Sequence, residues 1–167
     1  MKKMQLIVSV FCFCLILTLS LAMVGPGKAS TRMPEFSLEN VRDGSVVNSS
    51  SFAGKVLYIT FFATWCPPCV QEVPVLVELQ DRLADSGFSV VGLSVDQEGS
   101  SVVAGFAKKN AINYPVLMTE FKTTTDFGGV FGIPVAFLVN RAGNVVKRYT
   151  GYVQHKVLEK DIRSLLN

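Results

Sequence analysis

The pattern of hydrophobic and polar positions predicts alternating strands and helices. The uninterrupted apolar run VLYITFFA, residues 56–63, is typical of a strand buried on both faces of a sheet, and residues 88–95 predict a second one. Between them, apolar positions recur at helical spacing over residues 70–87. We expect Pro74 to kink this helix and Gly87 to end it.

The alternation continues to the end of the chain, after two weaker strand-like stretches near its start. These stretches are residues 35–40 and 45–48. The later elements are expected to be a helix over 100–110, a strand over 114–118, a turn or short helix over 124–131, a hairpin of strands 135–140 and 145–150, and a helix over 154–166. This order predicts an α/β fold in which helices pack on both faces of a mixed central sheet.

The N-terminal segment, residues 1–29, predicts export. Two lysines precede an uncharged, mostly apolar run over residues 6–24, which would make about 28 Å of helix, close to the thickness of bilayer hydrocarbon. Small residues around Ala29 suit a signal-peptidase cut. We expect a cleaved signal peptide or a retained membrane anchor. Residues 30–167 would then be one domain in the periplasm or on the outer face of the cytoplasmic membrane.

The net positive charge of the chain comes from residues 1–29. The sequence has 16 basic and 13 acidic residues, and three of the lysines fall within residues 1–29, so the remainder carries 13 of each sign. A balanced domain gives no reason to expect a nucleic-acid partner. The length of the whole chain, 167 residues, suits one compact domain, and its hydrophobic share of 49% excludes a disordered chain.

Two of the four cysteines point to chemistry. Cys12 and Cys14 lie in the apolar run and are expected to act as small hydrophobic residues there. Cys66 and Cys69 follow the strand at 56–63 directly and stand at the start of the next helix. Free N–H groups and the helix dipole favour a thiolate on Cys66 and lower its pKa. Cys69 is then placed to attack a mixed disulfide on Cys66.

The residues between the two cysteines modify that expectation. Pro67 and Pro68 have no N–H, so a backbone hydrogen bond to the Cys66 sulfur has to come from Cys69 or beyond. We expect a smaller depression of the Cys66 pKa than two donating residues would give. That favours a reducing enzyme over a strong oxidant.

Other functions could use the same sulfurs. Structural zinc usually takes four ligands, and the sequence has no second CxxC and only one histidine, His155. A Cu(I)-binding carrier remains an alternative, because soft sulfur suits Cu(I). A peroxiredoxin-like antioxidant enzyme is the other alternative, but it would need a T-x-x-C pattern, and only one residue separates Thr64 from Cys66.

Several segments together resemble one protein group. They are PEFSLEN, FFATWCPPC, VVGLSVD and GIPVAFLVNRAGNVVKRYTG. They resemble the thioredoxin superfamily and, within it, the membrane-anchored or periplasmic TlpA/ResA-type thiol–disulfide oxidoreductases. The resemblance covers residues 34–166, and residues 96–131 match the central helix–strand insertion of that branch. It implies a three-layer thioredoxin-like fold and catalysis by a Cys66–Cys69 disulfide without a further cofactor.

The resemblance also implies roles for residues around that pair. Cys66 would be the attacking thiol and Cys69 the resolving thiol, with Trp65 shielding them and contacting substrate. Glu72 matches a family acid proposed to exchange a proton with the buried thiol. An acid near a helix N-terminus is also favoured by the dipole alone, which is the other interpretation of Glu72.

A second segment would complete the substrate site. Pro134 falls where the superfamily has a cis-proline facing the disulfide, and the backbone of Ile133 would pair with a bound peptide. Val135 departs from the family, which usually has a threonine there. The implied partners are a protein disulfide substrate, with cytochrome c maturation a frequent assignment, and a membrane thiol-electron donor. We expect the enzyme to be a monomer.

Overall fold

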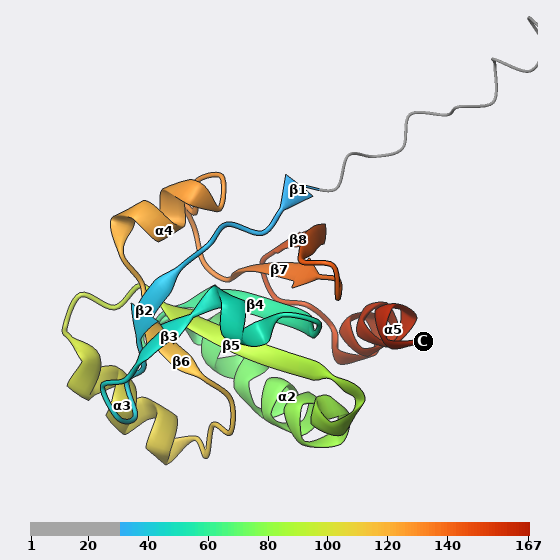
Figure 1. Ribbon diagram of the computed structural model, residues 1–167. Coiled ribbons are helices and arrows are strands. Elements are labelled where there is room, and N and C mark those ends of the chain that lie inside the picture. Colours follow the sequence, from blue (N-terminus) through green and yellow to red (C-terminus); the bar gives the residue numbers. More distant parts are fainter. Residues whose placement is uncertain (1–30) are drawn as a thin grey trace, which may run out of the picture.

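Six strands form one mixed sheet at the centre of the molecule, which the computed structural model describes over residues 31–167 (Figure 1). In spatial order the strands are β1 (Thr31–Arg32), β8 (Asn144–Thr150), β7 (Val135–Val139), β4 (Val56–Phe62), β5 (Phe88–Ser94) and β6 (Val116–Met118). Strands β4, β5 and β6 are parallel, whereas β7 runs antiparallel to both β4 and β8. Residues 1–29 lie outside the described part, so their role as signal peptide or anchor stays a prediction.

Strand β4 is the centre of the sheet, and all seven of its residues are buried. Its apolar run has hydrogen-bonded neighbours on both sides, with Tyr58 opposite Val90 of β5 and Leu138 of β7. Because side chains alternate along a strand, Tyr58 and Phe62 face one apolar cluster and Phe61 faces the other. The continuous apolar pattern therefore reflects burial on two faces, as expected from the sequence.

Three long helices cover the first face of the sheet. They are α2 (Pro67–Leu83), α3 (Ser100–Lys109) and α5 (His155–Leu166). Their buried apolar side chains belong to one cluster with Tyr58, and they include Leu76, Leu79, Val103, Leu158 and Ile162. No helix among residues 31–167 is long and apolar enough to cross a membrane.

Shorter elements cover the second face. They are η1 (Ser49–Phe52), α4 (Phe121–Asp126) and the small antiparallel sheet of β2 (Ser37–Glu39) and β3 (Val46–Asn48), which lies in front of the large sheet in Figure 1. Phe127, directly after α4, packs edge-on against Phe61 with ring centroids 5.3 Å apart. The α/β fold expected from the sequence is confirmed, with only short helices on this face.

The bounds of several elements differ from the expectation, and for helix α2 the reason is backbone chemistry. Helix α2 begins at Pro67, because proline suits the first helical turn, and it gives way after Leu83 to a 3-10 turn, η2 (Ala84–Ser86). Gly87 follows at a φ of 83°, which glycine adopts without strain. Strand β6 begins at Val116 rather than at residue 114. Helix α4 begins earlier than expected, at Phe121 rather than at residue 124.

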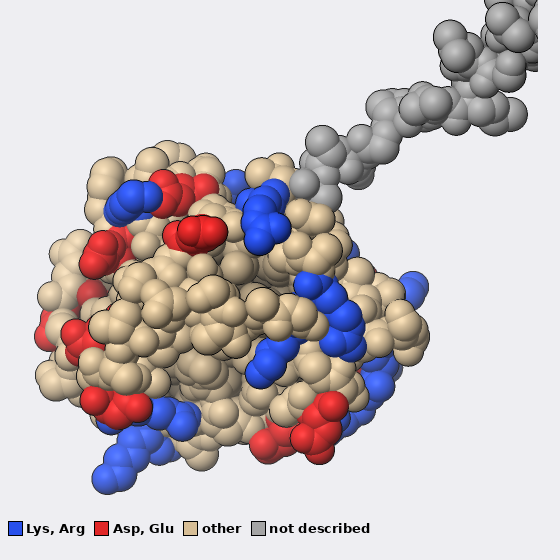
Figure 2. Space-filling model, in the orientation of Figure 1, with Lys and Arg blue, Asp and Glu red and all other residues tan. Residues whose placement is uncertain are grey.

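Charged side chains are spread around one visible face of the molecule. In Figure 2, most acidic residues lie on the left and lower parts of this face, several basic residues lie to the right of its centre, and an uncharged area separates them. No continuous basic track crosses this face of the described residues.

Candidate redox active site

Cys66 and Cys69 form a disulfide where β4 leads into α2. Their Cα atoms are 5.3 Å apart, and the two residues are only 4% and 3% exposed. A turn from Ala63 to Cys66, closed by the Cys66 N–H donating to the Ala63 carbonyl at 3.2 Å, places the pair at the N-terminus of the helix. The peptide dipoles of α2 therefore point their positive end at Cys66.

The first turn of α2 offers few hydrogen-bond donors to that sulfur. Pro67 and Pro68 occupy the first two helical positions and carry no N–H. The Val70 N–H donates instead to the Cys66 carbonyl at 3.0 Å. The Cys69 N–H is therefore the first helical amide that could donate to the Cys66 sulfur, and that hydrogen bond stays a prediction.

Glu72 is a buried acid one helical turn beyond Cys69, and it is 3% exposed. Its Oε1 accepts a hydrogen bond from the Val153 N–H at 2.8 Å. Burial raises the pKa of Glu72 above its ordinary value, and the Val153 hydrogen bond offsets part of that rise. Residues three apart lie on the same side of a helix, so Glu72 and Cys69 share one side of α2. The proton exchange of Glu72 with the buried thiol stays a prediction.

Two buried tyrosines share the surroundings of Glu72. Burial, followed by the nearby charge of Glu72, raises the pKa of both Tyr58 and Tyr114. The Tyr58 hydroxyl finds no hydrogen-bond partner among residues 31–167. The sequence analysis assigned these tyrosines no role; their only signal was a phenol within or next to an apolar strand.

The peptide bond between Ile133 and Pro134 is cis, as the family resemblance implied. Phe61 of β4 pairs with Val135 of β7, so Pro134 lies at the edge of the sheet where β4 ends. The Gly151 N–H donates to the Pro134 carbonyl at 2.8 Å. Ile133 is half-buried and packs against both apolar clusters. Its pairing with a bound peptide stays a prediction.

Two hydrogen bonds from backbone N–H groups, one to a carbonyl and one to a side-chain carboxyl, link the two halves of the site. Gly151 bonds Pro134, and two residues later Val153 bonds Glu72, one turn beyond Cys69. The structure thus brings together residues from α2, from the start of β7 and from the segment between β8 and α5.

Three exposed aromatic side chains lie next in the chain to residues of the redox site, or one residue away from them. Trp65 precedes Cys66 and is 65% exposed, Tyr152 precedes Val153 and is 43% exposed, and Phe131 lies just before Ile133 and is fully exposed. The role of Trp65 toward substrate stays a prediction. The sequence analysis did not identify Phe131 or Tyr152, because an aromatic residue in a loop gives no sign of its exposure.

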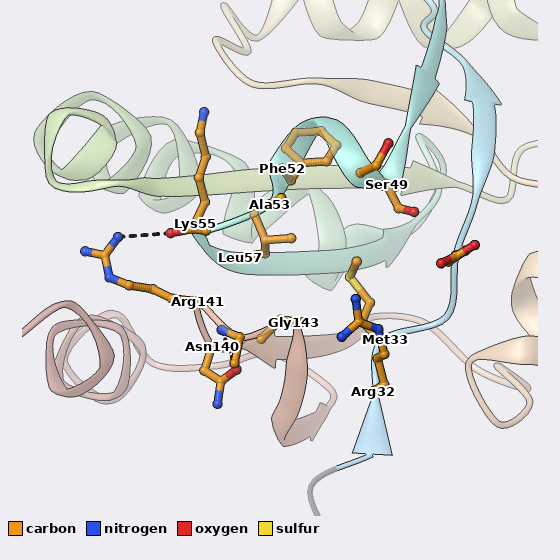
Figure 3. Close-up of a pocket in the computed structure, with 15 residues that line it drawn as sticks. Arg32, Met33, Ser49, Phe52, Ala53, Lys55, Leu57, Asn140, Arg141 and Gly143 are labelled. Carbon is orange, nitrogen blue, oxygen red and sulfur yellow. Dashed lines mark hydrogen bonds between the residues drawn. The ribbon is translucent and has the colours of Figure 1, made fainter.

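The pocket in Figure 3 lies at the opposite end of β4 from the cysteines. It has a volume of about 190 Å³ and is lined by Lys55 and Leu57 from the start of β4 and by Arg141 and Gly143 from the β7–β8 turn. Arg141 donates to the carbonyl oxygens of Gly54 and Ser86 at 3.1 and 2.8 Å. This pocket contains no cysteine and is not part of the redox site.

Within residues 31–167, no group of three or more His, Cys, Asp or Glu side chains could hold a metal ion. A closed CxxC pair at a helix N-terminus, beside a buried acid and a cis-proline, defines a thiol–disulfide oxidoreductase with a thioredoxin-like fold.

Comparison with known proteins gives the family. The model of the Redoxin family matches residues 28–166, so the chain belongs to that family. It is 30% identical over 125 residues to the thiol-disulfide oxidoreductase ResA of Bacillus subtilis (strain 168), covering 75% of this chain and 69% of that protein. Within the thioredoxin superfamily it is therefore a TlpA/ResA-type enzyme, whose redox-active cysteine pair needs no further cofactor.

Solved structures agree with this assignment. A thiol:disulfide interchange protein of the thioredoxin family from Chlorobium tepidum TLS is similar with a TM-score of 0.77 and 34% identity, covering 84% of this chain and 99% of that chain. A DsbF homologue from Corynebacterium diphtheriae is similar with a TM-score of 0.75 and 25% identity, covering 84% and 96%.

Proposed function

We propose that this enzyme is exported and reduces disulfide bonds in proteins outside the cytoplasm. The observation that carries the proposal is the buried Glu72 carboxyl one turn beyond Cys69, because a resolving thiol needs a proton acceptor before it can attack. The two prolines at the start of α2 support the reducing direction, since they remove donors that would stabilise a Cys66 thiolate.

In the first step, the Cys66 thiolate of the reduced enzyme attacks one sulfur of the substrate disulfide. A bond forms between the Cys66 sulfur and that substrate sulfur, and the other substrate sulfur leaves as a thiolate. The N-terminus of α2 stabilises the attacking thiolate electrostatically.

In the second step, Glu72 accepts the proton of the Cys69 thiol, and the Cys69 sulfur attacks Cys66. The Cys66–Cys69 disulfide forms, and the substrate sulfur that was bound to Cys66 leaves as a thiolate. The enzyme dithiol is thereby oxidised, and the reduced substrate sulfurs become thiols by taking one proton from Glu72 and one from water. The raised pKa of Glu72 suits this role, because a more basic carboxylate takes the thiol proton more readily.

Export and partners complete the proposal. Residues 1–29 would carry the domain across or into the cytoplasmic membrane, and residues 30–167 would work as a monomer in the periplasm or on the outer face of the cytoplasmic membrane. A membrane thiol-electron donor would reduce the Cys66–Cys69 disulfide after each cycle. The family resemblance makes cytochrome c precursors a candidate substrate class.

The direction of electron flow is tested by the reduction potential of the Cys66–Cys69 couple. Titration of the full chain against glutathione or dithiothreitol buffers, followed by Trp65 fluorescence, should give a value nearer to about −270 mV, as in thioredoxin, than to about −120 mV, as in the oxidant DsbA. A potential close to the second value would show an oxidase and overturn the proposal.

The substrate is tested by trapping. Cys69→Ala should accumulate mixed disulfides on Cys66 in the cell envelope, because the second step is blocked, and reduction should release the trapped protein for identification. Cys66→Ala is the matched control, since it keeps a thiol in the site but removes the attacking one. Equal trapping by both variants, or by neither, would argue against Cys66 as the attacking thiol.

A further inference from the structure

Asp96 is a buried carboxylate beside the redox site that the mechanism above does not use. It is 6% exposed and follows the end of β5, two residues after Ser94. The register of the sheet pairs Ser94 with Phe62, the last residue of β4, and the Val95 N–H donates to the Phe62 carbonyl at 2.9 Å. Asp96 therefore lies against the turn that leads from β4 to the cysteines.

The carboxylate holds that turn with several hydrogen bonds. Thr64 donates its N–H to Asp96 Oδ2 at 3.0 Å and its hydroxyl to Asp96 Oδ1 at 2.6 Å. The Ser94 hydroxyl donates to Oδ2 at 2.7 Å, and the Asp96 N–H donates back to Ser94 Oγ at 3.1 Å. Both oxygens of the buried acid are thus occupied, and hydrogen bonds to a carboxylate are stronger than neutral ones.

Thr64 is the residue through which Asp96 can affect the chemistry. It lies inside the turn from Ala63 to Cys66, directly before the exposed Trp65. Fixing both the amide and the hydroxyl of Thr64 restricts the backbone on either side of it. The segment after β5 thus holds the residue that directly precedes Trp65 in the chain.

We propose that Asp96 is a positioning residue of the redox site, whose carboxylate fixes Thr64 and so holds Trp65 and Cys66 in the orientation that meets a protein disulfide. The inference rests on the proposed function, because orientation matters only if a protein has to dock. Sulfur–sulfur exchange needs the attacking sulfur in line with the target bond. A docked protein cannot adjust to a misplaced Cys66, whereas a small disulfide can.

Three variants of the full chain separate this role from a structural one. Asp96→Asn keeps the size of the side chain but replaces one acceptor oxygen with an NH₂ group. Thr64→Val removes the hydroxyl donor and leaves the buried carboxylate in place. Thr64→Ser keeps the hydroxyl and is the matched control. Trp65 is the only tryptophan of the chain, so intrinsic fluorescence reports on the turn itself.

We expect Asp96→Asn and Thr64→Val to increase acrylamide quenching of Trp65. They should also lower kcat/KM for insulin reduction by about tenfold, the effect of one lost charge-assisted hydrogen bond. The rate with 5,5′-dithiobis(2-nitrobenzoate) should change by less than about threefold, because this small disulfide docks freely. Thr64→Ser should behave as the wild type. The double variant Asp96→Asn/Thr64→Val should be no slower than the slower single variant, since both break one contact.

The proposal would be overturned if a variant lost as much activity on the small disulfide as on insulin. It would also be overturned if a folded Asp96→Asn or Thr64→Val variant kept the Trp65 quenching and the insulin kinetics of the wild type. Circular dichroism identifies a variant that has not folded. If Asp96→Asn does not fold, the results of Thr64→Val decide whether the proposal holds. A wild-type enzyme with no insulin reductase activity would contradict the proposed function instead. In that case Trp65 quenching still tests the Asp96–Thr64 contact, because it needs no substrate.

Discussion

Glu72 and Val153 join the redox helix to the segment before α5 through a hydrogen bond of 2.8 Å from the Val153 N–H to the Glu72 carboxyl. Val153 lies two residues after Gly151, whose own N–H bonds the carbonyl of Pro134. One short segment therefore holds both the buried acid next to Cys69 and the cis-proline. The acid is kept in a fixed place even though burial disfavours its charged form.

The pH dependence of stability should reveal this buried acid. The folded-state pKa of Glu72 is raised by burial above the ordinary value of 4.5, so the folded chain binds a proton that the unfolded chain releases. Wild-type stability should therefore fall as the pH rises above about 4.5 and level off above the folded-state pKa. Glu72→Gln removes this loss and keeps an oxygen for Val153, so the variant should gain on the wild type with rising pH.

Urea unfolding of the oxidised proteins between pH 4 and pH 8 would measure that difference. Glu35→Gln, at an exposed position, controls for the loss of one negative charge. A stability difference between Glu72→Gln and wild type that stays constant over this range would contradict the argument.

Tyr58→Phe should be neutral or stabilising by up to about 1 kcal/mol. The hydroxyl is buried without a partner among residues 31–167, and leaving a buried polar group unpaired is unfavourable. The rest of the ring packs in the core, with its centroid 5.9 Å from that of Tyr149, and phenylalanine preserves this packing. Thermal unfolding of both proteins checks the prediction. A loss of more than about 1 kcal/mol would mean that the hydroxyl has a partner, such as a buried water.

Sequence reasoning was most successful where the relevant residues are adjacent in the chain. The apolar strand, the CxxC pair and the helix of β4–α2 could be predicted because burial and helix capping leave a local pattern. The contact between Asp96 and Thr64 could not, because 32 residues separate them and only the pairing of β4 with β5 brings them together.

The same limit applies to Glu72. Its position one turn after Cys69 was visible in the sequence, but its hydrogen-bond partner is the amide of Val153, 81 residues away. Short elements were also difficult to predict. Strand β1 consists of two residues, both exposed, and so has no hydrophobic pattern.

Phe131→Ala should weaken the docking of protein substrates without affecting the fold. The Phe131 side chain is fully exposed, so its removal takes no apolar surface out of the core. Because it lies close to Pro134 in the chain, we expect it to contact apolar residues beside the substrate disulfide. The KM for insulin should rise roughly 3- to 10-fold, as expected for about 1 kcal/mol of lost apolar contact. Phe121→Ala, also highly exposed but on α4, should leave KM unchanged.

Gly129→Ala should show whether the position of Phe131 matters. A Cβ at Gly129 would lie 2.6 Å from the Phe131 ring, so the ring has to move. Gly128 is the matched control, because its φ of 81° is close to the 78° of Gly129 but a Cβ there meets nothing within 4 Å. Both alanine variants should lose about 1 kcal/mol of stability from the left-handed backbone. Only Gly129→Ala should also raise the KM for insulin, as Phe131→Ala does, and an equal rise in both would assign the effect to the loop backbone instead.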